Sequence, residues 1–520
     1  REPHGGSQMK QTCSTKVSSA RMIRITLDGQ SLDPATVERI AMNEAPVEIA
    51  GATRKAVAAG RRIVERYVKE NLPAYGLTTG LGARVGEMLP KEAIADFSYR
   101  MIRGRAQGLG RPLSERAARA VMAVRLNTML SGAAGQSIGL VDHLAEALNR
   151  QLAAVIPSTA SIGATDLVAM AALGHGLIGE GEMLFRGKRM PAAKALQAAG
   201  LAPIKLGPKD GQVLCNNTAF TAGLAALATV RAERAIESHI VAGALSLEGF
   251  RGNSSPLQPR VLALRPHAGE AEAGRRIRRL LSSGLLLKKG EARRLQDPLS
   301  FRCMAQVFGA ALAESERLRK AVTIEINGSS DNPAVIEAED HIVTTGNFHL
   351  LQLSLAADSL ARALAWCATD SVSRVARLMA PGFSGLPPLL SSDATERGGF
   401  GPLMKPAEAL RAEIIHLANP VPVMASHNAD GQEDSLSHAP LAVQKLEELL
   451  ERYELAVAME LVAAAQAVDL AKPRRIAPRL AKVHAAVRTL HRFIDEDHPV
   501  GREIEAVAEQ IVRSGMLLQL

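Results

Sequence analysis

Residues Pro157–Glu182 read PSTASIGATDLVAMAALGHGLIGEGE, and the interpretation of the rest of the chain depends on this stretch. It opens with small and polar residues, has one acidic residue, Asp166, ahead of its apolar part, and continues as a run of small apolar residues. Alanine and leucine favour helices, and a helix that is apolar on all faces is buried. The stretch therefore predicts a polar loop that leads into a buried helix.

The same stretch resembles the signature segment of the histidine and phenylalanine ammonia-lyase family. In that family a run of the form S-[VI]-G-A-S-G-D-L leads into a helix that ends in G-E-G. Ser161–Ala164 match the run directly, and Asp166 and Leu167 match after a gap of one residue. The family's Ala-Ser-Gly triplet cyclises into an electrophilic methylidene-imidazolone group, but this chain has Ala164-Thr165-Asp166 in its place.

The altered triplet argues against that prosthetic group. Ring closure needs a glycine nitrogen to attack the carbonyl two residues back, in a strained turn that glycine tolerates most easily. Here Asp166 follows directly, and Thr165 in place of serine could give at best a methyl-blocked alkene. We therefore predict a protein without methylidene-imidazolone and without another cofactor, whose intact mass shows no loss of water.

Composition predicts a large helical protein. The chain has 520 residues, of which 47% are hydrophobic and 3% aromatic, and alanine and leucine dominate. The resemblance covers nearly the whole chain after Met22 and implies the all-α fold of the ammonia-lyase and fumarase-like superfamily. That fold is a long central helical bundle that assembles as a homotetramer, with residues from three subunits in each active site. We expect a tag or disordered tail at residues 1–21, an N-terminal part to about residue 215, and the bundle at about 216–520.

Charge, hydropathy and cysteine usage exclude several classes of function. The net charge is +9, but basic residues are interleaved with glutamates as on solvated helix faces, so we expect no nucleic-acid partner. No apolar run reaches the roughly 18–20 residues of a membrane helix, and the N-terminus lacks the apolar region of a signal peptide, so we expect no membrane contact. The four cysteines form no CxxC pair, which predicts a cytoplasmic protein without disulfides or a metal site.

A glycine-rich loop carries the candidate base. Tyr75–Gly82 read YGLTTGLG, whose glycines exclude a helix, and no lysine follows in the position of a phosphate-binding loop. The run resembles the family's Y-G-x-N-T-G-F-G loop, which implies that Tyr75 is the catalytic base. In GRAQGLG, Arg105 stands where the family has a histidine. This arginine either supplies a fixed cation to the site or faces solvent at a helix end.

Three further motifs supply candidate substrate contacts. Asn216 aligns with the asparagine of the family's K-[ED]-G-L-A-L-[LI]-N-G-T motif, although an asparagine before a helix is ordinarily an N-cap. The run LQDPLSFRCMAQVFGA matches V-Q-D-P-Y-S-[LI]-R-C-x-P-Q-V-x-G, which implies that Arg302 clamps the substrate carboxylate and that Gln296 also binds substrate. In TTGNFHL we interpret Asn347 as a substrate contact and His349, at a helix start, as structural.

Two charged residues complete the candidate site. GGFGPLMKPAEALRAEI resembles the G-x-x-S-G-F-M-x-x-Q segment of the family, and we expect Lys405 just before the first turn of a helix, able to point into a cavity. The alternative is an exposed lysine. SHNADGQEDSLSH resembles S-x-N-Q-E-D-H-V-S, whose glutamate lies beside the substrate's amine, which implies that role for Glu433.

The missing electrophile decides the expected reaction. An ammonia-lyase needs it because ammonia is a poor leaving group, whereas a trimethylammonium group leaves directly as neutral trimethylamine. The chain is similar in this respect to ergothionases, which lack the prosthetic group and convert ergothioneine to thiourocanate and trimethylamine. We predict a carbon–nitrogen lyase of this kind, acting on a small betaine substrate.

The predicted mechanism divides the work among these residues. Arg302 binds the carboxylate, and Tyr75 removes a β-proton. A cation, Lys405 or Arg105, polarises the ring and helps the phenol to lose its proton. The carboxylates expected to balance the quaternary cation are Glu433 and Asp166.

Three alternatives stay open. The first is a histidine ammonia-lyase with an unusual prosthetic group, against which Arg105 and Leu299, in place of a family tyrosine, both count. The second is a lyase for another activated amino acid. The third is a catalytically dead helical scaffold, which would have no need of Tyr75, Arg302 and Glu433.

Overall fold

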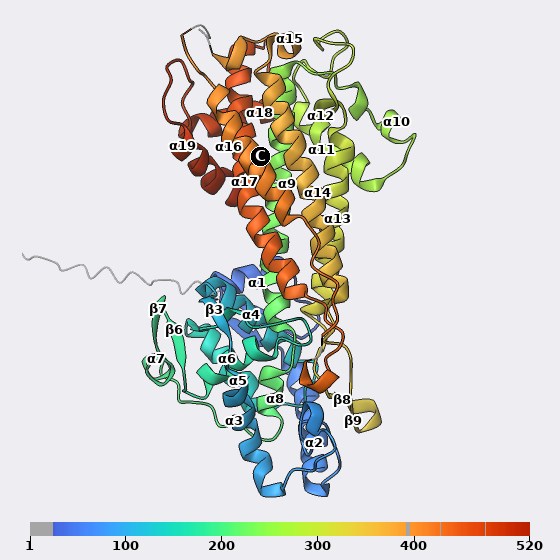
Figure 1. Cartoon of the computed structure of the whole chain (residues 1–520), viewed down its shortest axis with the longest axis vertical. Helices are drawn as coiled ribbons and strands as arrows, with labels where there is room; N and C mark the ends of the chain where they lie inside the picture. The colour runs from blue at the N-terminus through green and yellow to red at the C-terminus, as the bar shows by residue number, and fades with distance from the viewer. Residues whose placement is uncertain (1–23, 392–395, 427, 474, 520) are drawn as a thin grey trace, which may run out of the picture.

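The computed structural model describes residues 24–391, 396–426, 428–473 and 475–519, so the expected tail at residues 1–21 lies outside the described residues. The fold is all-α, as predicted, and its long helices pack side by side in an elongated bundle (Figure 1). These long helices are α9 (Ala219–Phe250), α13 (Met304–Glu325), α14 (Leu351–Leu378) and α17 (Ala439–Ala471).

Helix α9 lies at the centre of the bundle because it is small or apolar on nearly every face. Every residue from Ala219 to Val230 is buried, as expected for a helix without a polar side. The helix approaches α17 closely at Gly249, where an added Cβ would lie 2.9 Å from the Cβ of Ala467. The stretch Asp210–Phe250, which includes α9, is long and apolar enough for a membrane span, contrary to expectation, but its most apolar window is entirely buried inside the protein.

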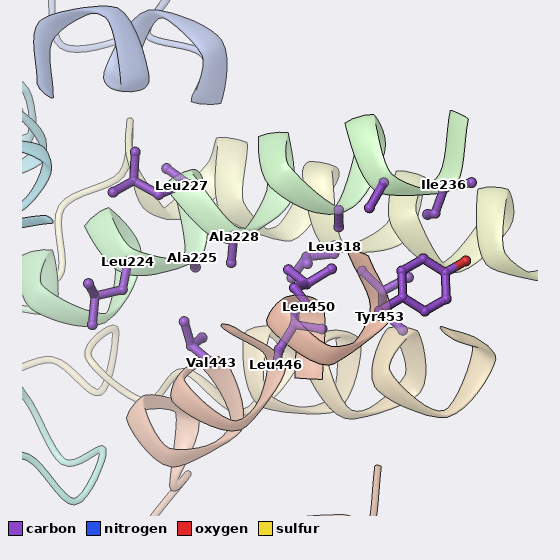
Figure 2. Packing of buried hydrophobic residues seen from close by; sticks show 14 of the residues in the cluster. Leu224, Ala225, Leu227, Ala228, Ile236, Leu318, Val443, Leu446, Leu450 and Tyr453 are labelled. Atoms are coloured by element: carbon purple, nitrogen blue, oxygen red, sulfur yellow. The ribbon is translucent and has the colours of Figure 1, made fainter. Parts of the chain in front are cut away.

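The apolar stripe on α17 faces this central helix. Figure 2 shows Val443, Leu446 and Leu450 of α17 in the cluster that also holds Leu224 and Leu227 of α9. Each buried leucine or valine contributes roughly 1.5–3 kcal/mol relative to an exposed one. The stripe predicted from the sequence is buried in full, and its members are Val443, Leu446, Leu450, Tyr453 and Val457.

A fully buried polar network joins three of the long helices. Glu460 of α17 forms an ion pair with Arg374 of α14 at 2.6 Å between Oε1 and Nε, and a hydrogen bond with His239 of α9 at 3.0 Å. Arg374 also donates to the carbonyl oxygen of Ser300, at 3.1 Å, in the short helix α12 (Leu299–Arg302). Because buried charges are tolerated only when paired, this network fixes how the helices pack against one another.

Shorter elements surround the N-terminal end of α9. The helices are α1 (Pro34–Ala41), α2 (Gly51–Glu70), α3 (Ile94–Arg105), α4 (Glu115–Met129), α5 (Ile138–Asn149), α6 (Leu167–Leu177), α7 (Ala192–Ala198) and α8 (Asp210–Cys215). Strand β1 (Ile25–Leu27) pairs in parallel with β2 (Val47–Ile49). The antiparallel pairs are β3 (Leu109–Pro112) with β5 (Pro157–Thr159), β6 (Glu182–Phe185) with both β4 (Leu152–Ala154) and β7 (Lys188–Pro191), and β8 (Ala334–Ile336) with β9 (His341–Val343).

The other end of the bundle carries the remaining helices. Besides α12 they are α10 (Pro259–Leu262), α11 (Ala268–Leu281), α15 (Pro381–Ser384), α16 (Met404–Leu417), α18 (Pro478–Leu490) and α19 (Gly501–Val507). In Figure 1 they lie in the upper half of the view, whereas α2, α3 and α8 lie in the lower half. This separation decides which candidate site residues one chain brings together.

Candidate active site

A cavity of about 1070 Å³ lies among the shorter elements around the start of α9. Its wall is built by segments that are far apart in the sequence. The segments that contribute residues to it are 75–90, 97–105, 164–167, 212–216, 332, 344–349 and 429–435. Among the predicted site residues, Tyr75, Arg105, Asn216 and Glu433 all border this cavity.

The Tyr75 loop follows α2 and is not helical, as its glycines predict. Gly76 has a φ of +66°, which glycine adopts without strain, and a Cβ on it would lie 2.4 Å from Nε2 of Gln212. The half-buried Tyr75 hydroxyl accepts a hydrogen bond from the amide of Gly82 at 3.1 Å. The loop therefore holds the phenol at the cavity wall through its own backbone.

Helix α8 supplies two buried amides beside this loop. Asn216 follows the last residue of α8, and its Nδ2 donates to the carbonyl oxygen of Asn332 at 2.7 Å. Gln212 Nε2 donates to the same carbonyl at 3.1 Å and to the carbonyl of Tyr75 at 3.2 Å. Asn216 does not cap α9, because the N-cap position belongs to Thr218. The amide side chains instead hold two loops together at the cavity wall.

Arg105 and Glu433 carry opposite charges and both border the cavity. Arg105 is the last residue of α3, and its half-buried side chain borders the cavity, which favours the site cation over the solvent-facing alternative. Glu433 lies in the loop before α17, where its amide donates to the carbonyl of Asn428 at 3.2 Å. Burial raises the pKa of Glu433, and the positive charge of Arg105 opposes that rise. The cavity thus holds a partly desolvated carboxyl group under the influence of a fixed positive charge.

Asp166 does not face the cavity, contrary to its expected role beside a quaternary cation. Its carboxylate is fully buried and accepts hydrogen bonds from Ser161 Oγ at 2.7 Å and from the amide and hydroxyl of Thr221, both at 2.8 Å. Burial raises its pKa to about 6, and the hydrogen bonds from Thr221 and Ser161 oppose the rise. The Asp166 carboxylate thus satisfies the backbone and hydroxyl donors of Thr221 at the start of α9 and the hydroxyl of Ser161 in its own loop.

Residues Ala164-Thr165-Asp166 do not fit a methylidene-imidazolone group. Ring closure would need the amide nitrogen of Asp166 to attack the carbonyl of Ala164. That amide instead donates to the carbonyl of Asn217 at 2.7 Å, at the residue that precedes α6. Thr165 has a φ of +65°, unusual for a β-branched residue, and borders the cavity together with Ala164. The position of the family's electrophile is therefore occupied by a threonine side chain and a hydrogen-bonded amide.

Four predicted site residues are not brought to this cavity by the chain itself. Arg302 ends α12, which lies in the upper half of Figure 1, and is half-buried. Gln296, in the loop before α12, is exposed and does not border the cavity. Lys405 is exposed and is the second residue of α16, so the prediction that it precedes the regular helix is wrong. A proline after it is compatible with the first helical turn, where no intrahelical donor is lost. Asn347 is exposed beside the cavity but is not part of its wall.

The structure adds wall residues that the sequence analysis undervalued. His349, interpreted as structural, borders the cavity, and its Nε2 lies 3.2 Å from Ser435 Oγ. Gln212 also borders the cavity and was not among the predicted site residues. It stands where the family motif has a leucine, and this change from an apolar to a polar residue could have indicated a role in the site. In the part of the chain that the structure describes, no group of His, Cys, Asp and Glu side chains is arranged to hold a metal ion.

Comparisons with known proteins agree with this geometry. A family model described as aromatic amino acid lyase matches residues 32–489. The histidine ammonia-lyase of Myxococcus xanthus is 35% identical over 497 residues, which cover 95% of this chain and 98% of that protein.

Two solved structures share the fold over nearly the whole chain. The ergothionase of Treponema denticola, in complex with desmethyl-ergothioneine sulfonic acid, gives a TM-score of 0.91 at 29% identity, covering 96% of this chain and 100% of that one. The histidine ammonia-lyase of Trypanosoma cruzi gives a TM-score of 0.88 at 29% identity, covering 96% of this chain and 94% of that one.

Proposed function

Since the chain belongs to the aromatic amino acid lyase family and is a carbon–nitrogen lyase, we propose that it eliminates trimethylamine from ergothioneine to give thiourocanate. The observation that carries this proposal is the local structure at Ala164-Thr165-Asp166, which does not fit the family's electrophile. A substrate whose nitrogen is already quaternary needs no such activation. The similarity to an ergothionase solved with a relative of this substrate supports the same choice.

The proposed reaction is a β-elimination carried out by side chains alone. The Tyr75 side chain acts as a phenolate, after its own proton has passed to solvent, and takes the proton from the β-carbon. The C–H electron pair becomes the second bond between the α- and β-carbons. The bond between the α-carbon and nitrogen breaks, and its electron pair leaves on neutral trimethylamine. Glu433 balances the quaternary cation before the bond breaks, and Arg105 stabilises negative charge that develops on the ring.

We further propose that the site is completed by other copies of the chain in a homotetramer. One chain places Tyr75 in the cavity but Arg302 at the other end of the bundle, so a carboxylate clamp must come from a neighbour. An exposed apolar stripe on α14 supports such contacts: Trp366 is 67% exposed, and Leu351 and Leu355 share its face at helical spacing. In the tetramer Arg302, Gln296, Lys405 and Asn347 would then line shared cavities. The location of the protein in the cytoplasm stays a prediction.

Histidine ammonia-lyase activity is the second candidate. It is favoured by the 35% identity to the Myxococcus xanthus enzyme, which exceeds the identity to the ergothionase. Histidine carries a primary amine, so this reaction would require some other way to activate ammonia as a leaving group. The structural misfit at Thr165 and Asp166 weighs against it.

One experiment separates these functions. The purified protein is incubated with ergothioneine and, separately, with histidine, while trimethylamine, ammonia and the ultraviolet absorbance of a conjugated product are followed. We expect trimethylamine and thiourocanate, with an intact mass that equals the sequence mass. Ammonia and urocanate from histidine would favour the second candidate instead. A folded tetramer that releases neither amine would refute both assignments and leave a lyase for another activated amino acid or a catalytically dead scaffold.

A further inference from the structure

Gln212 is a buried polar residue in the cavity wall to which the proposed mechanism gives no task. It lies in α8, is 1% exposed and borders the cavity. Its Nε2 donates to the carbonyl oxygens of Tyr75 and Asn332. Both partners are acceptors, so the orientation of the amide group is fixed, because the reverse orientation would set Oε1 against two carbonyl oxygens.

This glutamine is a poor choice for stability alone. Its Oε1 finds no hydrogen-bond partner among the described protein atoms, and burying such an acceptor is unfavourable. The related family motif has leucine at this position, which would fill the space without a lone acceptor. The Tyr75 loop also packs tightly on the amide, since a Cβ on Gly76 would approach Nε2 to 2.4 Å.

We propose that Gln212 is a positioning residue that holds the backbone of Tyr75 in place for proton removal. Its two hydrogen bonds connect the Tyr75 loop to Asn332, and the Asn332 carbonyl is in turn held by Asn216 Nδ2 at 2.7 Å. Gln212 thereby connects the backbone of Tyr75 to the Asn332 carbonyl, which also accepts the hydrogen bond from Asn216. The inference rests on the proposed function only in so far as Tyr75 is the base.

The chain offers a matched control for the test. Gln136 is 0% exposed, donates through Nε2 to the carbonyl of Met129 at 2.8 Å, and also has an Oε1 without a partner among the described protein atoms. It does not border the cavity. Gln212→Leu and Gln136→Leu therefore remove the same groups from equally buried sites, and only the first touches the Tyr75 loop. Gln212→Met is a second, unbranched variant for use if Gln212→Leu does not fold.

The first readout is amide hydrogen exchange of the segment that contains Tyr75, followed on the full-length protein without substrate. We expect faster exchange at residues 74–90 in Gln212→Leu and unchanged exchange there in Gln136→Leu. Equal exchange in wild type and Gln212→Leu would overturn the inference. This readout does not depend on any activity, so it stays decisive even if no substrate is found.

The second readout is the kinetics of trimethylamine release. We expect Gln212→Leu to lower kcat by roughly ten- to hundredfold with little change in KM, because a displaced base slows proton removal but not binding. The kinetic isotope effect for ergothioneine deuterated at the β-carbon should equal or exceed that of wild type. A smaller isotope effect, or a kcat loss explained by less folded protein, would contradict the proposal. Absence of turnover in wild type would instead refute the proposed function and leave the exchange result to decide on Gln212.

Discussion

The Arg105 guanidinium acts electrostatically on the Glu433 carboxyl group in the cavity, although Arg105 ends α3 and Glu433 lies in the loop before α17. Burial raises the pKa of Glu433 above its ordinary value, and the charge of Arg105 opposes the rise. The arginine thus keeps the carboxylate charged to a lower pH than burial alone would allow. A charged Glu433 is what a quaternary ammonium substrate needs.

Replacing Arg105 by glutamine should therefore move the acidic limb of activity to higher pH. Without the cation, the pKa of Glu433 rises further, so the carboxylate is lost earlier as the pH falls. We expect the midpoint of the acidic limb of kcat/KM for ergothioneine to move to higher pH. The measurement is a pH–rate profile of trimethylamine release.

Arg103→Gln is the control for this shift. Arg103 lies on the same helix, but it pairs with Glu180 at 2.6 Å on the surface and does not border the cavity. Its profile should follow that of wild type. An Arg105→Gln profile with an unmoved acidic limb would show that Glu433 does not control binding or catalysis through its charge.

Tyr75→Phe should abolish most of the activity while the substrate still binds. Loss of a general base costs roughly 10²–10⁴-fold in rate, whereas the phenyl ring keeps the shape of the cavity wall. The variant also loses the hydrogen bond from the Gly82 amide, which is worth about 1 kcal/mol. We expect a near-wild-type dissociation constant for ergothioneine by calorimetry and almost no trimethylamine release.

Tyr99→Phe provides the matched comparison for this loss. The Tyr99 hydroxyl accepts a hydrogen bond from the Leu206 amide at 2.9 Å, yet Tyr99 is not part of the cavity wall. The two variants should lose similar stability, and only Tyr75→Phe should lose activity. Equal activity in the two would remove Tyr75 from the role of base.

The sequence predicted the fold and several wall residues because helical periodicity and the family motifs are local patterns that can be recognised one segment at a time. The buried stripe on α17 and the glycine loop of Tyr75 follow from periodicity and motifs, and the motifs also identified Arg105 and Glu433 as candidates, both of which border the cavity. The prediction was wrong for Lys405, since a proline after it suggested a break although the first turn tolerates one.

Other features depend on long-range packing that no local pattern shows. Asp166 follows a loop that suggested an accessible carboxylate, but the fold brings it against Thr221 at the start of α9. The role of the Gln212 amide depends on its hydrogen bonds to the carbonyls of Tyr75 and Asn332, two residues that are distant from it in the sequence. Arg302 lies at the far end of the bundle, so its role in a site depends on assembly rather than on the fold of one chain.

Asp166→Asn should change how stability depends on pH. Burial raises the pKa of Asp166 to about 6, above its ordinary value of 3.8, so the folded protein pays to ionise it. The loss of folding free energy is absent at a pH below the ordinary pKa of 3.8. It reaches roughly 3 kcal/mol once the pH exceeds the pKa of about 6 in the folded protein. The variant has no such titration. We expect the stability advantage of wild type, followed by thermal melting, to shrink as the pH rises from about 4 to about 7. Parallel pH profiles for the two proteins would refute this account.

Trp366→Lys should weaken the proposed tetramer. The Trp366 side chain is exposed on the same face of α14 as Leu351 and Leu355, and a charge there would have to be buried in any contact with another copy. We expect smaller species in sedimentation velocity and a parallel loss of activity, because shared cavities would come apart. A tetramer of wild-type stability in this variant would place the contact surface elsewhere.

Glu460→Gln should destabilise the bundle strongly because it leaves a buried cation without its partner. Burial by itself would raise the pKa of Glu460, but the charge of Arg374 and the hydrogen bonds from His239 and Arg374 outweigh it, and the pKa lies well below its ordinary range. Breaking one side of such a pair costs roughly 3–5 kcal/mol, which should appear as a lower melting temperature. Replacing both residues, as Glu460→Met with Arg374→Met, removes the lone charge. The double variant should therefore be more stable than the Glu460→Gln variant, and an additive loss would show that the two residues act independently.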